Sequence, residues 1–220
     1  MTTRKRCAGL PQCAFVRSQA SSSPSEFDAA FRAACARVFV PGAAAASQPH
    51  VALDWIDSPV GPLILGATPE AICLLEFSEL ETLDARLTSL RHRTRAHFAV
   101  GTNRWLAALR VQLGEYFAAE RRDFSLPLTF GGSDFQHRVW SLLREIPYGQ
   151  TWFYRDLAER VGDLSATRAV GAANGMNPIA IVIPCHRVIY ANGDPGGFGG
   201  GLWRKQILLD LERGQARLDF

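Results

Sequence analysis

Long apolar runs are missing from this chain of 220 residues, although 47% of its residues are apolar. No uninterrupted stretch of about eighteen apolar residues occurs, which is the length that a membrane-spanning helix needs. The apolar stretch near the N-terminus is interrupted by Pro11 and Gln12, which argues against a signal peptide. The sequence therefore predicts a globular protein that buries a core and has no membrane partner.

Cofactor motifs are also missing. The sequence contains no phosphate-binding loop, no dinucleotide fingerprint and no cluster of metal ligands. Cys7 and Cys13 lie near each other, but no second pair of Cys or His at ligand spacing accompanies them. We therefore expect a protein that works without a cofactor and without a metal.

Cysteine and net charge are both modest. The five cysteines are odd in number and lack the spacing of a disulfide framework, which favours a reducing, cytoplasmic compartment. The formal net charge of +3, from 24 basic and 21 acidic residues, is too small to identify a nucleic-acid partner.

Residues 1–50 differ in composition from the remainder. They are rich in serine and alanine, and they predict a mostly disordered leader with one short helix. Phe27, Phe31 and Ala34 give that helix an apolar stripe, and Ser25 is its expected N-cap. The composition suggests that this leader makes no stabilising contact with the core.

Residues 51–128 predict an N-terminal domain built on a small antiparallel sheet. Residues 51–56, 63–67 and 71–77 have the composition of strands, with a turn at residues 58–62. An apolar stripe from Trp105 to Phe117 predicts a helix that covers the sheet. Residues 124–132 are expected to form a linker.

Residues 129–215 predict a helical C-terminal domain, so the fold class is α+β. Ser133 and Gln136 form a capping box at the start of one helix. Residues 153–161 and 166–173 predict two more helices, the second capped by Ser165, and the short turn from Gly162 makes them a helix-turn-helix. This turn alone is weak support for DNA binding, because many helical pairs share it.

The chemistry centres on Cys185 and His186, which follow a buried apolar run at residues 179–183. A thiolate is the reactive form of cysteine, and a neighbouring base makes it available. Adjacent side chains of an extended chain point to opposite faces, so a tight turn or a bridging water must join the two. Glu212, at the end of the helix predicted at residues 202–212, is the candidate that orients His186. From the residues alone, two alternatives stay open: a buried structural thiol is the usual fate of a cysteine after an apolar strand, and Glu212 could be an exposed partner of Arg213.

The segment Ile-Val-Ile-Pro-Cys-His-Arg-Val-Ile at residues 181–189 resembles the active-site motif of the O6-alkylguanine-DNA alkyltransferases. The resemblance extends over the chain from about Val51. It includes Ser-Pro-Val-Gly-Pro-Leu at residues 58–63, Ile-Pro-Tyr-Gly at 146–149, Tyr-Arg-Asp-Leu-Ala at 154–158, Arg-Ala-Val-Gly at 168–171, Asn-Pro at 177–178 and Gly-Gly-Gly-Leu at 199–202. Several blocks in the same order are far more specific than Pro-Cys-His-Arg by itself.

The resemblance implies a direct-reversal repair protein, an enzyme that acts once. Cys185 would attack the alkyl group on O6 of guanine and keep it as a thioether, so that one chain repairs one base. His186 would take the thiol proton through a water, and Glu212 would hold His186 in the required tautomer. Asn177 would brace the segment before the cysteine. Tyr154 would crowd the phosphate beside the flipped base and donate to the base.

The resemblance also implies a DNA-binding face and a base pocket. The base must leave the duplex to be reached, and Arg168 would fill its place in the stack, with Ala169 and Gly171 beside it on the recognition helix. The residues implied for the pocket are Pro178, Val188, Phe198, Gly199 and Gly200. The expected partner is double-stranded DNA with O6-alkylguanine, or with O4-alkylthymine, bound by a monomer.

Two features depart from members of the family. The zinc ligands of some vertebrate members are not matched, which agrees with the absence of a metal motif. Gly200 and Ala180 stand where other members carry an aromatic residue and proline, so we expect a rim open to large groups such as benzyl. Residues 25–32 weakly resemble part of an AraC-type DNA-binding module; an unrelated leader is the alternative.

Two other classes of function fit the residues. A cysteine hydrolase would use Cys185 and His186 with turnover, and a DNA-binding regulator would use the helix-turn-helix alone.

Overall fold

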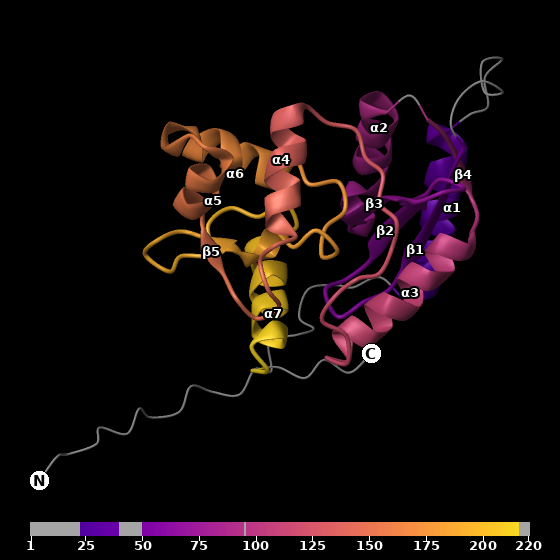
Figure 1. Ribbon diagram of the computed structural model, residues 1–220. Coiled ribbons are helices and arrows are strands. Elements are labelled where there is room, and N and C mark those ends of the chain that lie inside the picture. The colour runs from indigo at the N-terminus through magenta and orange to yellow at the C-terminus, as the bar shows by residue number, and fades with distance from the viewer. Residues whose placement is uncertain (1–22, 40–49, 95, 216–220) are drawn as a thin grey trace, which may run out of the picture.

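A computed structural model describes residues 23–39, 50–94 and 96–215. The pair Cys7 and Cys13 and the leader segments at residues 1–22 and 40–49 lie outside the described residues. Figure 1 shows the sheet with helices α1, α2 and α3 on one side of the molecule and helices α4, α5 and α6 on the other. The α+β class is confirmed.

Four strands form a mixed sheet rather than the antiparallel sheet predicted. They are β1 (His50–Ile56), β2 (Leu63–Ala67), β3 (Ile72–Phe77) and β4 (His97–Val100), in the order β3-β2-β1-β4. β2 pairs antiparallel with β1 and with β3, whereas β4 pairs parallel with β1. The chain crosses from β3 to β4 through the short 3-10 helix η2 (Leu80–Thr82) and helix α2 (Leu83–Arg93), and such a crossover allows parallel pairing.

Helix α1 (Pro24–Val38) packs on the sheet, so the expectation of a leader without core contacts is wrong. Phe27 and Phe31 are each 1% exposed, within an apolar cluster of β1, β2, β3 and α2 side chains. The N-cap is Ser23, which accepts from the Glu26 amide, rather than Ser25. The apolar stripe of the helix is confirmed, whereas the second apolar face of the sheet cannot be inferred from the composition of residues 1–50.

The other face of the sheet packs on helix α3 (Arg104–Phe117), which Asn103 caps as it accepts from two backbone amides. Because helices cover both faces, every residue of β2 is buried. Leu63 and Leu65 contact the cluster that includes α3, whereas Ile64 contacts the cluster that includes α1. The core that includes α3 continues into the C-terminal half of the chain.

The C-terminal half contains the helix-turn-helix. The elements of this half are α4 (Asp134–Leu143), β5 (Trp152–Phe153), α5 (Tyr154–Val161), η3 (Leu164–Ala166), α6 (Thr167–Gly175), η4 (Cys185–Arg187), β6 (Val188–Ile189) and α7 (Leu202–Glu212), and the helix-turn-helix consists of α5 and α6. The capping box of Ser133 and Gln136 is confirmed. Gly162 ends α5 with a φ of +97°, which favours glycine. The predicted Ser165 cap is wrong, because the Ser165 amide donates to Asp163 and η3 precedes α6.

Within the described ranges, no helix combines the length and the apolar character needed to cross a membrane.

Candidate active site

Strand β3 of the N-terminal half holds the segment that carries Cys185. The Leu75 amide donates to the Pro178 carbonyl at 3.0 Å, and the Ala180 amide donates to the Leu75 carbonyl at 2.8 Å. Asn177 braces the same segment, since its side chain donates to the Ile183 carbonyl at 2.7 Å and accepts from the Ile179 amide at 3.0 Å. These bonds fix the segment on both sides of its turn.

A strained backbone precedes the cysteine. Ile181 has a φ of +70°, a left-handed conformation that a β-branched side chain rarely adopts. Such conformations persist only where surrounding contacts impose them, and they concentrate at functional sites. The 3-10 turn η4 then begins at Cys185 and places Cys185 and His186 in one tight turn, which is one of the two arrangements expected from the sequence.

Glu212 is buried at the centre of a hydrogen-bond network rather than exposed beside Arg213. Its Oε1 accepts from His186 Nε2 at 2.8 Å, Tyr116 Oη at 2.8 Å and Arg187 Nη2 at 3.0 Å. Its Oε2 accepts from Arg187 Nε at 2.8 Å and the Gly149 amide at 3.0 Å. Burial raises the pKa of Glu212, but the bonds from His186 and the charge of Arg187 outweigh burial and hold that pKa well below its usual range.

This network assigns the tautomer of His186. An ionised carboxylate only accepts hydrogen bonds, so the proton of the imidazole lies on Nε2. In the neutral ring, Nδ1 then carries a lone pair, and it is buried without a hydrogen-bond partner among the described residues. Burial lowers the pKa of His186, despite the opposing effect of Glu212, so the neutral ring is favoured.

The thiol of Cys185 is 5% exposed. Burial raises its pKa, opposed by a hydrogen bond from Asn177 and by the nearby charge of Lys205. The resting group is therefore the thiol, and a base has to accept its proton before it can attack. His186 follows Cys185 in the same tight turn, and the lone pair on its Nδ1 makes it the candidate base.

Three polar groups of the site were not predicted from the sequence. Arg187 is 5% exposed and donates to Glu212 and to the Ile146 carbonyl, and Tyr116 reaches Glu212 from α3 in the N-terminal half. Lys205 is fully buried and donates to the carbonyls of Val188 and Pro195. Burial lowers the pKa of Lys205 to about 8. Arg187 stands in the recognised motif, but only the fold shows its partner.

The family resemblance implies that the backbone carbonyls of Cys185 and Val188 accept from the exocyclic amine of guanine, and both already have donors in the structure. The Cys185 carbonyl accepts from Asn174 Nδ2 at 3.3 Å, and the Val188 carbonyl accepts from Lys205. Each carbonyl oxygen has a second lone pair, so both remain able to accept from a base.

A cavity of about 260 Å³ adjoins Cys185. Of the predicted pocket residues, Phe198, Gly199 and Gly200 line it with Asn177 and Ala180, whereas Pro178 and Val188 are not among its lining residues. The rim at Gly200 is not open in this conformation. A Cβ at Gly200 would lie 2.4 Å from the ring of Phe77, a β3 residue that packs against Phe198 with ring centroids 5.5 Å apart. The ring of Phe77 from the N-terminal half therefore fills the space that a bulky side chain at position 200 would occupy.

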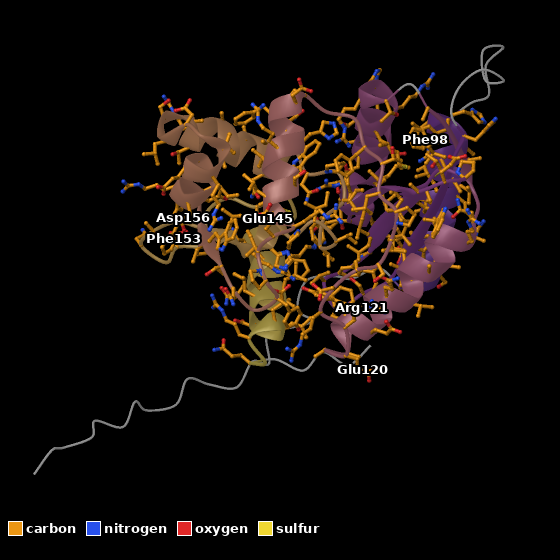
Figure 2. The ribbon with its side chains drawn as sticks, viewed as in Figure 1. Phe98, Glu120, Arg121, Glu145, Phe153 and Asp156 are labelled. Atoms are coloured by element: carbon orange, nitrogen blue, oxygen red, sulfur yellow. The ribbon has the colours of Figure 1, made fainter. Side chains whose placement is uncertain are left out.

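The predicted DNA-binding residues gather on α5 and α6. Arg168 and Ala169 are exposed on α6. Gly171 packs against Tyr154, since a Cβ added at Gly171 would lie 3.8 Å from Cε1 of the Tyr154 ring. Tyr154 is 7% exposed and donates to the Gly197 carbonyl at 3.5 Å. Figure 2 shows Phe153, next to Tyr154, on the opposite side of the molecule from Phe98 of the sheet. The helix-turn-helix therefore presents its outer face away from the N-terminal half.

A buried cysteine beside an oriented histidine, next to a helix-turn-helix, defines a cysteine nucleophile on a scaffold of DNA-binding type. Comparisons with known proteins agree. Residues 53–130 match the model of the 6-O-methylguanine DNA methyltransferase ribonuclease-like domain, and residues 134–214 match that of the DNA binding domain of the same family.

Relatives and solved structures give the same result. The methylated-DNA–protein-cysteine methyltransferase of Mycolicibacterium paratuberculosis is 46% identical over 158 residues, which are 72% of this chain and 90% of that protein. The crystal structure of Mycobacterium tuberculosis O6-methylguanine methyltransferase has a TM-score of 0.64 at 43% identity, covering 77% of this chain and 96% of that one. Mycobacterium tuberculosis OGT in complex with DNA has a TM-score of 0.63 at 41% identity, covering 76% and 94%. The chain belongs to the 6-O-methylguanine DNA methyltransferase family.

Proposed function

We propose that Cys185 is the residue that accepts the alkyl group when this protein repairs DNA. The protein is a DNA-binding repair methyltransferase that moves an alkyl group from a damaged base to a protein cysteine. The observation that carries the assignment is the position of Cys185: it borders the cavity and directly precedes a histidine held by a buried carboxylate.

The proton and electron movements follow from the network. The thiol of Cys185 gives its proton, through a bridging water, to Nδ1 of His186, while Glu212 stabilises the imidazolium that forms. The thiolate attacks the carbon attached to O6, and the electron pair of the breaking carbon–oxygen bond stays with guanine. A proton returned to the guanine ring leaves ordinary guanine and a thioether on Cys185. The carbon–sulfur bond is stable to water, so each chain acts once.

We further propose how the base reaches the cavity. Arg168 is exposed on α6, where it would enter the duplex and occupy the place of a flipped O6-alkylguanine. Tyr154 lies behind that helix with its hydroxyl at the Gly197 carbonyl, near the loop that lines the cavity. A base flipped past Arg168 would therefore pass Tyr154 before it reached Cys185. A single chain contains every group named, so we expect a monomer to act.

Two expectations about organisation also belong to this proposal. Residues 51–128 and 129–215 would be the two functional units, the second containing Cys185 and the helix-turn-helix. The three described cysteines, Cys35, Cys73 and Cys185, are free, in keeping with a reducing compartment such as the cytoplasm.

Incubation with duplex DNA that carries labelled O6-methylguanine tests the proposal. The label should move to the protein and stop near one equivalent, and Cys185→Ser should abolish transfer yet retain binding to the alkylated duplex. Cys73→Ser, which changes a half-buried thiol on β3, is the matched control and should still transfer. Transfer by Cys185→Ser would refute the assignment. Continuous release of label would indicate a hydrolase, and binding without transfer a regulator.

A further inference from the structure

The turn at residues 58–62, between β1 and β2, receives a side chain from helix α7. Ser58 shapes this turn, since its hydroxyl donates to the Gly61 carbonyl at 2.6 Å and its carbonyl accepts from the Gly61 amide at 2.8 Å. Gly61 has a φ of +83°, and a Cβ there would lie 3.1 Å from Nη2 of Arg204. The glycine is therefore needed both for the left-handed turn and for the close approach of Arg204.

Arg204 joins three segments of the chain through their backbone carbonyls. Its Nε donates to the Val60 carbonyl in the turn at 2.6 Å, and its Nη2 donates to the Ser78 carbonyl after β3 at 3.2 Å. Its Nη1 donates at 2.9 Å to the carbonyl of Gly200, a residue that lines the cavity beside Cys185. Two of these carbonyls belong to the N-terminal half and the third to the cavity rim, so one guanidinium ties the rim to the N-terminal half.

The charge of Arg204 does not explain why an arginine occupies this position. Arg204 is 3% exposed, and burial lowers its pKa, opposed by the charge of Glu79. The ion pair with Glu79, at 3.2 Å, involves a carboxylate that is 48% exposed. An apolar side chain in place of a buried ion pair often leaves stability unchanged or higher. The three directed bonds do explain the arginine, because they fix relative positions that an apolar side chain would leave free.

The contacts of Arg204 lie directly behind the wall of the cavity. Phe77 lines the cavity, and the guanidinium carbon of Arg204 lies 5.4 Å from the centroid of its ring. A Cβ on Gly200 would lie 2.4 Å from the same ring. Arg204 itself is not among the lining residues. A shift of Arg204 would therefore move Phe77 and the Gly200 loop, although Arg204 does not reach the reacting groups.

We propose that Arg204 is a positioning residue for alkyl transfer, and that the turn at residues 58–62 acts in the reaction by holding Arg204. The proposal rests on transfer to Cys185. The bonds of Arg204 hold the rim loop against β3, and so keep the flipped base at the distance and angle at which the sulfur attacks. Rate depends steeply on such geometry, and a displacement of about 1 Å can lower a rate by about a hundredfold. The N-terminal half thus contributes to the reaction, although Cys185 and His186 both lie in the C-terminal half.

Single-turnover transfer from duplex DNA that carries O6-methylguanine separates a positioning role from a merely structural one. In Arg204→Met the rate at saturating protein should fall by about tenfold to a hundredfold, whereas the dissociation constant for the alkylated duplex should stay close to that of the parent. Arg204→Lys keeps the charge but has one nitrogen in place of a planar fork, so it should restore little of the rate. Glu79→Gln keeps the three carbonyl bonds and should retain the rate of the parent.

Gly61→Ala tests the turn without changing a residue that lines the cavity. The added Cβ would displace Nη2 of Arg204, so the rate at saturation should fall. The double variant should lose little more than Arg204→Met alone, because both changes break the same contact. Gly193→Ala is the matched control, since Gly193 has a φ of +85° but a Cβ there has nothing within 4 Å. It should keep the rate of the parent.

Melting temperatures measured in parallel show which variants are folded at the assay temperature. If Arg204→Met is unfolded, the comparison of Gly61→Ala with Gly193→Ala decides. A parental rate at saturation in folded Arg204→Met, a loss confined to the dissociation constant, or equal losses in the two glycine variants overturns the proposal. Failure of the parent to transfer the methyl group to Cys185 would instead refute the proposed acceptor chemistry.

Discussion

Replacement of Arg187 by methionine tests the buried network most directly. Arg187 provides two of the five hydrogen bonds that Glu212 accepts, and it is the cation that balances this carboxylate. Methionine has a similar length, so the cavity left is small, but the carboxylate stays buried with only Tyr116, His186 and the Gly149 amide as donors.

The expected cost to stability is large. Removal of one partner from a buried ion pair typically destabilises by about 3–5 kcal/mol, because the other charge is left uncompensated. For a protein of this size, that loss corresponds to a fall of roughly 6–20 °C in Tm. Urea unfolding of the parent and of Arg187→Met measures it. The double variant Arg187→Met with Glu212→Gln removes both charges and should recover part of the loss.

The pH dependence of transfer gives a second readout. The rate needs neutral His186, and Arg187 is one of the charges that lower the pKa of His186, after burial itself. Without that cation the pKa of His186 should rise, so the acid limb of the rate profile should move to higher pH. The pKa of Glu212 is lowered in the folded protein, so its stabilising effect is present above the unfolded value of about 4.3 and is lost as pH falls. The difference in free energy of unfolding between the parent and Arg187→Met should therefore become smaller at acid pH.

If Arg187→Met lowered the free energy of unfolding by less than about 1 kcal/mol, the value typical of exposed ion pairs, the reasoning would be contradicted. An acid limb that stays in place while the variant remains folded would also contradict it.

Three further predictions concern the DNA face, the cavity rim and the leader. Arg168→Ala should slow repair in duplex DNA much more than reaction with a free O6-alkylguanine base, which needs no flipping, and equal loss on both would assign Arg168 to the fold. Phe77→Ala should raise the rate with O6-benzylguanine relative to methyl repair, because the Phe77 ring fills the space beside Gly200, and an unchanged ratio would show that this ring does not limit the rim. Phe31→Ala should lower the free energy of unfolding by about 3–5 kcal/mol in urea titrations, the range for a buried phenylalanine, whereas a change under 1 kcal/mol would mean that α1 contributes little.

Local patterns predicted most elements of the fold. The strands at residues 51–56 and 63–67, the helix from Trp105 and the capping box at Ser133 depend on neighbouring residues, and sequence reasoning found them. Strand β4 has only four residues and α2 has a weak apolar stripe, so neither was predicted. The direction of β4 depends on how the chain crosses the sheet, which no local pattern encodes.

The residues of the site also divide into those that a local pattern marks and those that depend on distant contacts. The motif and the helix end mark Cys185, His186 and Glu212 in the sequence. The places of Tyr116 and Phe77 in the site depend on contacts between halves of the chain that are far apart in sequence. No spacing rule connects residue 116 to residue 212, so only the packed structure could reveal that contact.

Gly149 links two functions that are usually considered separately. It lies in the turn between α4 and β5, its φ is +76°, and a Cβ there would lie 2.9 Å from the Glu212 carbonyl oxygen. Its amide also donates to the Glu212 side chain. The peptide that leads into the helix-turn-helix is thus also a support of the carboxylate that orients His186. A genetic screen for cells that lose resistance to alkylating agents should recover substitutions of Gly149 alongside those of Cys185. Natural variation should be as restricted at this turn as at the nucleophile, although Gly149 touches no reacting atom.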